Sequence, residues 1–215
     1  MALSVAAERK TAQSFTRLNI ERVKKEQAVA QYDCLKAHFN PHFLFNSLNV
    51  LTTLVHKDPH MAEQFVLRLS KVYRYILEVD KAAPLVSLAE EIKHLDAYLF
   101  LMKIRFGENF HFNNQLTKEG YKCKIAPLTL QILVENALQH NEVSKMYPLS
   151  ISVFFDNNYL IVRNNLRLKK HRADTPKQGL LHLEARYKLL STQPVLIEKT
   201  MDSFTVKIPL VSGVQ

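Results

Sequence analysis

The sequence contains few of the residues that crosslink or punctuate small domains. Only two of its 215 residues are cysteine, Cys34 and Cys123, and they stand far apart with no CxxC pattern. This spacing argues against a disulfide framework or a zinc site and suits a reducing compartment. Only four residues are glycine, so little of the chain can form the glycine-rich cradles that bring a backbone close to phosphates.

Long hydrophobic runs are absent as well. No stretch of about 18 apolar residues occurs, so the sequence predicts no membrane-spanning helix. The segment from Met1 to Lys10 lacks the apolar core of a secretory signal. With 47% hydrophobic and 23% charged residues, the chain has ordinary globular composition, enough for one large or two small domains.

The chain is basic, with 29 Lys and Arg against 20 Asp and Glu. A positive balance of this kind could meet nucleic acid, acidic lipid or a nucleotide. The basic residues are spread along the sequence, and no aromatic residues are interleaved with them in a recognised nucleic-acid motif. We therefore expect no nucleic-acid partner.

The most informative stretch is a helix expected to begin at Pro41, with Asn40 as its cap. One apolar stripe repeats in steps of four, three and four residues and consists of Leu44, Leu48, Leu51 and Val55. A polar stripe with the same steps consists of His42, Asn46, Asn49 and Thr53. A first-turn imidazole outside an apolar seam is an exposed nucleophile near neutral pH, whereas a solvated surface histidine is the alternative interpretation.

Two more helical segments flank this stretch. Residues 2–37 lack proline and glycine and become heptad-like towards Phe39, which predicts a coiled-coil signalling helix over 1–37. Residues 61–78 form a second amphipathic helix and, with 42–56, a helical hairpin. Two such hairpins from two chains would make a four-helix bundle, so we expect a homodimer with a dimerisation domain over 38–84.

From residue 85 onward the pattern becomes mixed. Ser87 and Glu90 form a capping box for a helix that continues to Phe106 and ends at Gly107. Helices are also expected over 128–140 and 179–191, strands over 110–112, 123–125, 151–155, 159–162, 195–199 and 204–208, and a loop over 163–178. This order predicts an α+β chain whose second domain, 85–215, is an α/β sandwich with helices on one face of an antiparallel or mixed sheet.

The helix over 128–140 carries a second candidate site. Asn136 and His140 lie one turn apart, with Glu135 and Gln139 beside them, so a polar patch interrupts an apolar helix. Carboxylate or amide oxygens beside an imidazole can hold Mg²⁺ and a triphosphate, because Mg²⁺ prefers hard oxygen ligands. The solvated face of a helix is the alternative interpretation.

Two literal strings connect these sites to one family. The string from Asn40 to Asn49 resembles the phosphoacceptor box of the LytS-like (autolysin-sensor and YehU-type) sensor histidine kinases. The string from Leu133 to His140 is similar to the N box of their GHKL (Bergerat) ATP-binding domain. The resemblance spans about residues 38–210. It implies that His42 is phosphorylated, Glu135 takes part in catalysis and Asn136 binds Mg²⁺.

The remaining ATP motifs depart from the family pattern. Asn164 stands in the place of the adenine-binding aspartate, with no glycine after it, and of the second glycine motif Gly179 and the leucine after it remain. An amide can still accept a hydrogen bond from adenine, but the charge is lost. The cations of the following stretch, including Lys169 and Lys170, could meet phosphates as side-chain charges or could simply be solvated.

The resemblance therefore predicts a two-component sensor kinase. ATP, bound with Mg²⁺ near Asn136 and His140, would phosphorylate His42, and the phosphoryl group would pass to an aspartate of a response regulator. The chain would be the cytoplasmic portion of a membrane-anchored sensor, attached to the membrane only through a part absent from this sequence. The alternative is a degenerate kinase that serves as a dimeric signalling module without catalysis.

Overall fold

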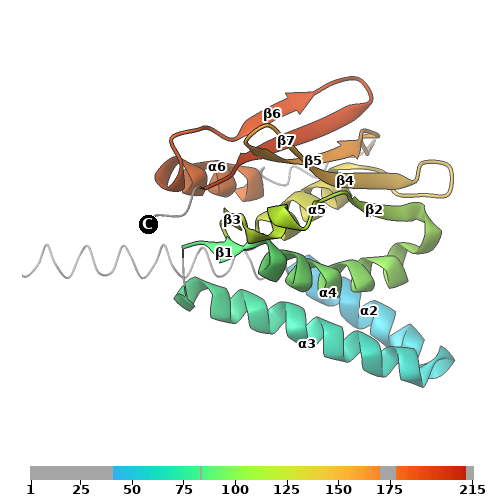
Figure 1. The fold of residues 1–215 in the computed structure, drawn as a ribbon. Helices are drawn as coiled ribbons and strands as arrows, with labels where there is room; N and C mark the ends of the chain where they lie inside the picture. Colours follow the sequence, from blue (N-terminus) through green and yellow to red (C-terminus); the bar gives the residue numbers. More distant parts are fainter. Residues whose placement is uncertain (1–40, 83, 170–177, 212–215) are drawn as a thin grey trace, which may run out of the picture. The chain divides into compact units, whose positions relative to one another are not determined.

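The computed structural model describes residues 41–82, 84–169 and 178–211 (Figure 1). The helix predicted over 1–37, the Asn40 cap and Lys170 lie outside these residues. The chain divides into a unit Met1–His42 and a unit Phe43–Gln215. The architecture that follows is that of the second unit.

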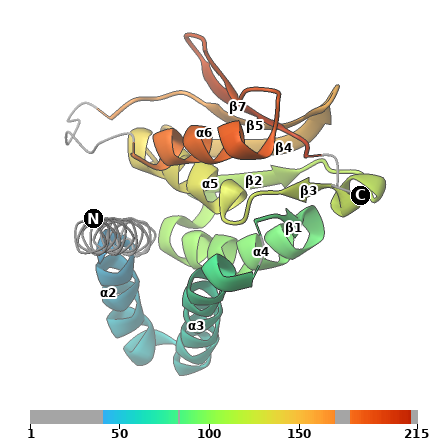
Figure 2. The same ribbon diagram turned by 90° about the vertical axis from the view of Figure 1, so that its left-hand side faces the viewer.

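A five-stranded mixed sheet, in the order β2-β4-β5-β7-β6, forms one layer of this unit. Its strands are β2 (Phe110–Asn114), β4 (Leu149–Asp156), β5 (Tyr159–Asn165), β6 (Leu196–Lys199) and β7 (Ser203–Pro209). The pair β2 and β4 is parallel and the other neighbours are antiparallel. Figure 2 shows the helices gathered on one face of this sheet, so the predicted mixed α/β arrangement is confirmed.

The covering helices are α4 (Leu88–Phe106), α5 (Thr129–His140) and α6 (Gln178–Leu190). The sheet meets them through alternate side chains, because successive residues of a strand point to opposite faces. In β4, Leu149, Ile151 and Val153 are buried while the residues between them are partly exposed. These strand residues and the buried faces of α4, α5 and α6 form one hydrophobic core.

The capping box predicted for α4 is present. The Ser87 side chain accepts a hydrogen bond from the Glu90 backbone N–H at 3.2 Å, and Glu90 Oε2 accepts one from the Ser87 N–H at 2.9 Å. The helix ends at Gly107, whose φ of 58° is costly for a residue with a Cβ. Ser87 also belongs to β1 (Val86–Ser87), which pairs with β3 (Lys124–Ile125) in a small sheet that periodicity did not predict.

Two further helices precede α4. These are α2 (Pro41–Lys57) and α3 (Pro59–Ala82), separated by Asp58 alone. The helix α3 packs on α4, where the Arg68 guanidinium lies 5.3 Å from the centre of the Phe100 ring. Buried residues of α3 and α4 therefore belong to one hydrophobic core.

The buried face of α2 differs from the leucine stripe of the sequence. Phe43 and Ser47 are the buried residues of this helix, and the Phe43 ring packs against Tyr73 of α3 and Tyr98 of α4 at 6.0 and 5.3 Å between ring centres. Within this chain the leucine stripe stays partly open, and Leu48 is 43% exposed. The helix thus has apolar residues on more than one face.

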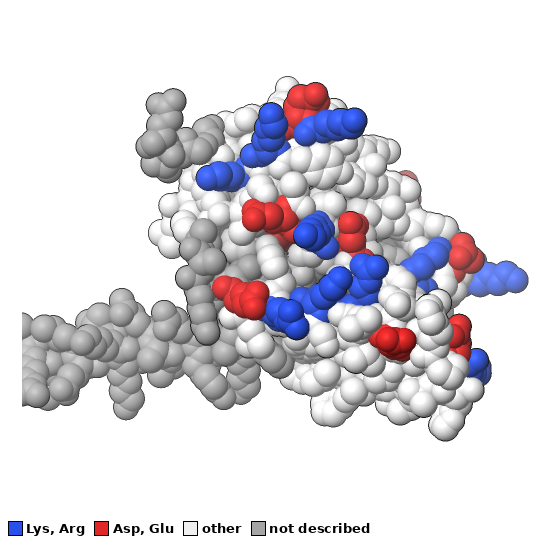
Figure 3. Space-filling model, turned by 60° about the horizontal axis from the view of Figure 1, so that its bottom comes forward, with Lys and Arg blue, Asp and Glu red and all other residues white. Residues whose placement is uncertain are grey.

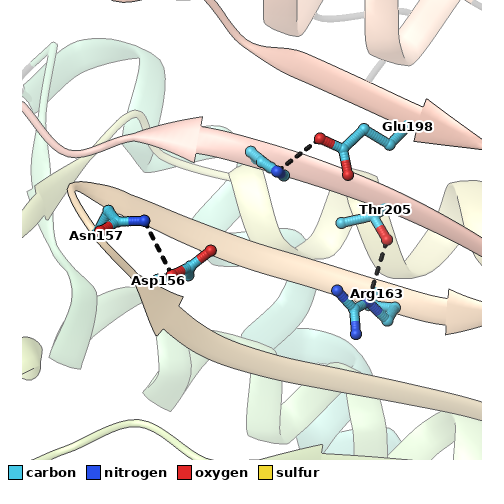
Figure 4. Close-up of polar contacts among 6 residues, drawn as sticks. Asp156, Asn157, Arg163, Glu198 and Thr205 are labelled. Atoms are coloured by element: carbon cyan, nitrogen blue, oxygen red, sulfur yellow. Dashed lines mark hydrogen bonds and ion pairs between the residues drawn. The ribbon is translucent and has the colours of Figure 1, made fainter.

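The loop predicted from Arg163 onward begins too early. The strand β5 continues through Asn165, and Arg163 pairs with Ser152 on one side and Thr205 on the other. Its Nε donates to Thr205 Oγ1 at 3.2 Å (Figure 4), and its guanidinium lies over the Phe154 ring. The strand itself was predicted over 159–162, and only its last three residues were missed, because they are polar although they keep the ladder pairing.

The positive charge of the chain is not gathered on the face in Figure 3. There, Lys and Arg side chains are interspersed with Asp and Glu. Mixed signs of this kind screen one another and produce no strong local field.

Candidate functional site

His42 lies in the first turn of α2, as predicted, and its side chain is exposed. The next residue, Phe43, is buried against two tyrosine rings. A buried aromatic residue in the first turn fixes the start of the helix, because the core around it is closely packed. His42 is thus an exposed residue directly before a buried one.

The polar patch of α5 is also present as predicted. Glu135, Asn136 and His140 are half-buried and Gln139 is exposed. The Glu135 carboxylate accepts a hydrogen bond of 2.7 Å from the Gln131 side-chain amide, one turn earlier. Its charge raises the pKa of Tyr73 and Tyr98, although burial is the larger cause for both. The Glu135 carboxylate therefore acts electrostatically on the two tyrosines that contact Phe43.

Asn164 lies near the end of β5 and is 5% exposed. Its side-chain amide donates to the Asn165 carbonyl at 2.5 Å. The chain then runs beside the end of α5, where the Asn141 side chain accepts a hydrogen bond of 2.7 Å from the Arg167 N–H. The segment that replaces the family's first glycine motif is thus held against the helix that carries Asn136.

Two predicted phosphate-binding residues make contacts within the protein itself. The Lys169 ammonium donates to the carbonyls of Leu138 and Gln139, at 3.1 and 2.9 Å. Burial lowers its pKa, and Arg105 does so to a smaller extent. A Cβ at Gly179 would lie 3.3 Å from Ile132, so this glycine allows α6 to approach α5 closely. These contacts are all within the protein, so they do not test whether Lys169 and Gly179 bind a nucleotide.

A buried carboxylate that the sequence did not reveal holds the start of α5. Glu91 of α4 is fully buried and accepts hydrogen bonds from the backbone N–H groups of Leu128 and Leu130, at 3.1 and 3.0 Å. The first N–H groups of a helix have no partner within the helix, so Glu91 supplies one. Leu128 has a φ of 64°, a left-handed conformation that is costly for leucine and is held here by the surrounding contacts.

Residues of α3 and α6 also contact Glu91 or the segment just before α5. The Tyr75 hydroxyl of α3 donates to Glu91 at 3.2 Å. From α6, the Arg186 guanidinium donates to the Pro127 carbonyl at 3.1 Å, and the Tyr187 hydroxyl accepts from the Ala126 N–H at 3.0 Å. Burial raises the pKa of Glu91 to about 7, although its hydrogen bonds and Arg186 act in the opposite direction.

Sequence reasoning missed Glu91 although one signal was available. The residue lies three positions after Leu88 and four before Leu95, both fully buried, so it occupies an apolar position of α4. A carboxylate at such a position is rarely buried without a partner.

A hollow of about 640 Å³ lies beyond the end of β5 and contains none of the predicted site residues. It is lined by residues of three segments: Glu142, Met146, Tyr147, Leu166, Arg167, Leu168, Lys199, Thr200 and Met201. Across the described ranges there is no group of three or more His, Cys, Asp or Glu able to hold a metal ion. None of the helices described is both long and apolar enough to span a bilayer.

Comparisons with known proteins indicate the same family as the string from Asn40 to Asn49. Residues 30–110 match a family model described as histidine kinase. The sensor histidine kinase BtsS of Escherichia coli K12 is 37% identical over 120 residues, which are 56% of this chain and 21% of that protein. The sensor protein LytS of Staphylococcus saprophyticus is 31% identical over 146 residues, 68% of this chain and 22% of that protein.

The solved structure of the Acinetobacter baumannii histidine kinase AdeS is more distant. It is 13% identical with a TM-score of 0.40, covering 80% of this chain and 98% of that one. This chain spans about a fifth of the length of its curated relatives. The matches show that the chain belongs to the histidine kinases. Within that family its sequence is LytS-like, because the curated relatives that it matches include the sensor proteins LytS and BtsS.

The raised pKa of Glu91 leads to a prediction about stability. A carboxyl whose pKa is near 7 when folded and near 4.5 when unfolded binds more protons in the folded state between these values. The free energy of unfolding therefore falls as pH rises through this window, by at most about 1.4 kcal/mol per pH unit. In Glu91→Gln this contribution disappears. The other titratable groups, such as His94, are present in both proteins, so their contributions cancel in the difference between the two.

Urea unfolding of both proteins at several pH values from 4.5 to 7.5 measures this contribution. We expect the stability of the parent relative to Glu91→Gln to decrease as pH rises. A difference that does not vary with pH would contradict the raised pKa of the buried carboxyl group.

Proposed function

We propose that this chain is the transmitter part of a two-component sensor kinase, which phosphorylates itself on His42 with ATP and passes the phosphoryl group to a response regulator. The observation that carries this proposal is the exposed His42 at the start of α2, within a string typical of the family's phosphoacceptor box. The relatives BtsS and LytS, named as sensor proteins, support it.

The chemistry that we propose needs a neutral imidazole and a proton acceptor. A ring nitrogen of His42 forms a bond to the γ-phosphorus as the bond from that phosphorus to the bridging oxygen breaks, and ADP leaves. The imidazole loses its N–H proton, which the Glu135 carboxylate accepts. A carboxylate oxygen of a response-regulator aspartate then attacks the phosphorus, the nitrogen–phosphorus bond breaks, and the leaving imidazole takes back a proton.

The nucleotide would bind along α5 and the end of β5. The half-buried Asn136 offers a side-chain oxygen of the kind that Mg²⁺ binds, and His140 follows one turn later. Bound Mg²⁺ would neutralise charge on the phosphates. Asn164 would face adenine, Gly179 would lie near the phosphates, and Lys169 would reach them only by leaving the α5 carbonyls. In this proposal residues 85–215 form a GHKL-type domain.

Dimerisation through α2 and α3 is part of the proposal, with residues 38–84 as the bundle-forming domain. Both helices carry large apolar side chains that remain exposed in the single chain. These are Phe45 (66%), Leu48 (43%) and Val55 (50%) in α2, and Val66 (43%), Leu67 (50%) and Leu77 (45%) in α3. Apolar surface of this extent usually indicates a protein partner, and a second copy would cover it.

A degenerate kinase without catalysis is the second candidate. It is favoured by the internal hydrogen bonds of Asn164 and Lys169, since both residues must change partners to meet a nucleotide. A position on the cytoplasmic side of a membrane-anchored sensor remains an expectation from the family.

The first prediction concerns the acceptor. Incubation of the purified chain with γ-labelled ATP and Mg²⁺ should give an acid-labile, base-stable phosphate that disappears in His42→Gln. His56→Gln is the matched control, because His56 is the other described histidine of α2 and is also exposed. Its labelling should equal that of the parent. Equal labelling of His42→Gln would move the acceptor to another residue.

The second prediction concerns the nucleotide. The loss of a charged hydrogen bond to adenine costs about 1.5 to 3 kcal/mol, or roughly ten- to a hundredfold in affinity. We expect weak ATP binding whose Mg²⁺ dependence is lost in Asn136→Ala, and tighter binding in Asn164→Asp. Calorimetry at millimolar ATP with Mg²⁺ measures both. Absence of binding to the parent and to Asn164→Asp would favour the degenerate kinase.

The third prediction concerns the dimer. Leu48→Asp places a charge in the proposed apolar seam and should convert a micromolar dimer into monomer, since an unpaired buried charge is costly. Leu189→Asp is the control, because Leu189 of α6 is 89% exposed and lies outside the proposed interface. Sedimentation equilibrium distinguishes these states. A monomeric parent at micromolar concentration would refute the proposed bundle.

A further inference from the structure

A chain of buried hydrogen bonds leads to the Glu135 carboxylate. His94 Nε2 of α4 lies 2.5 Å from Gln131 Oε1 of α5, and Gln131 Nε2 donates to Glu135 Oε1 at 2.7 Å. His94 and Gln131 are 6% and 5% exposed, so bulk water does not compete strongly for these bonds. The His94 ring is stacked on Tyr75 of α3, with 4.0 Å between ring centres.

In these two hydrogen bonds the donor and the acceptor can each be assigned. Burial lowers the pKa of His94 to about 4, so the imidazole is neutral at physiological pH and carries one N–H. Because the Gln131 amide nitrogen faces the carboxylate, its oxygen faces His94 and can only accept. The N–H of His94 is therefore on Nε2. A reversed amide would place its oxygen against the Glu135 carboxylate.

We propose that His94 and Gln131 are positioning residues, which orient the Glu135 carboxylate for the proton transfer. The inference rests on the proposed function, in which Glu135 is the catalytic base. A glutamate has three rotatable side-chain bonds, and holding one oxygen leaves the second in a defined place. Hydrogen bonds to a carboxylate are stronger than those between neutral groups, so one donor can hold this orientation.

Tyr75 completes the arrangement from a third helix. Its ring fixes the plane of the His94 imidazole, and its hydroxyl donates to Glu91, which holds the start of α5. The same side chain thus supports both the helix that carries Glu135 and the histidine that orients it.

Two substitutions of His94 separate positioning from packing. His94→Phe keeps a ring to stack on Tyr75 and removes the N–H. His94→Gln places an amide N–H close to the position of Nε2. We expect kcat for autophosphorylation to fall about 10- to 100-fold in His94→Phe, with KM for ATP within about twofold of the parent. His94→Gln should retain kcat within about threefold.

The double variant His94→Phe/Gln131→Leu removes both buried partners and leaves neither polar group unsatisfied. Its thermal midpoint should stay near that of the parent, while its kcat should be as low as that of His94→Phe. In a Glu135→Gln background, His94→Phe should have no further effect on kcat, since both changes act on one carboxylate. Parental kcat in His94→Phe and in the double variant would overturn the positioning role.

The outcomes distinguish this inference from the proposed function. If the parent incorporates no phosphate, or Glu135→Gln works at the parental rate, the proposed function or its base is wrong. NMR of the Gln131 side-chain amide tests the positioning itself without any activity. Its protons should exchange slowly in the parent and His94→Gln and at least about tenfold faster in His94→Phe. Equal exchange in all three proteins would refute the inference.

Discussion

The rest of the structure depends on the buried Glu91 carboxylate, which holds the start of α5 in place. It accepts the Leu128 and Leu130 N–H groups, and Tyr75 donates to it from α3. Removing a partner from buried polar groups costs their full desolvation, so α5 cannot shift without breaking several bonds together. Since α5 carries Glu135 and Asn136, the chemistry that we propose depends on the same contacts that join three helices.

Much of this fold could be predicted from the sequence, because its helices are strongly periodic and locally capped. The capping box at Ser87 and the end at Gly107 were predicted and are present. The helix that begins at Pro41 and its exposed His42 were also predicted, since Pro41 and the repeated stripes are local signals. The resemblance of two sequence strings to one family then suggested that His42 and Asn136 serve the same function, which helix periodicity and capping could not have suggested.

The features that sequence reasoning missed depend on partners distant along the chain. Glu91 meets residues 37 and 39 positions later, and His94 meets Gln131 37 positions later. Periodicity gives the faces of a helix but does not say which face meets which neighbour. It therefore chose the leucine stripe of α2, whereas Phe43 and Ser47 face the core. Asn164 and Lys169 show the same limit, because their present partners follow from the path of the chain after β5.

Amide hydrogen exchange tests whether Glu91 holds the start of α5. The N–H groups of Leu128 and Leu130 should exchange only through global unfolding, as those of the core strands do. In Glu91→Ala they should lose this protection, while the amides of β4 and β5 keep theirs. Exchange of the two groups in the parent as fast as that of an exposed loop, or unchanged protection in Glu91→Ala, would contradict the account.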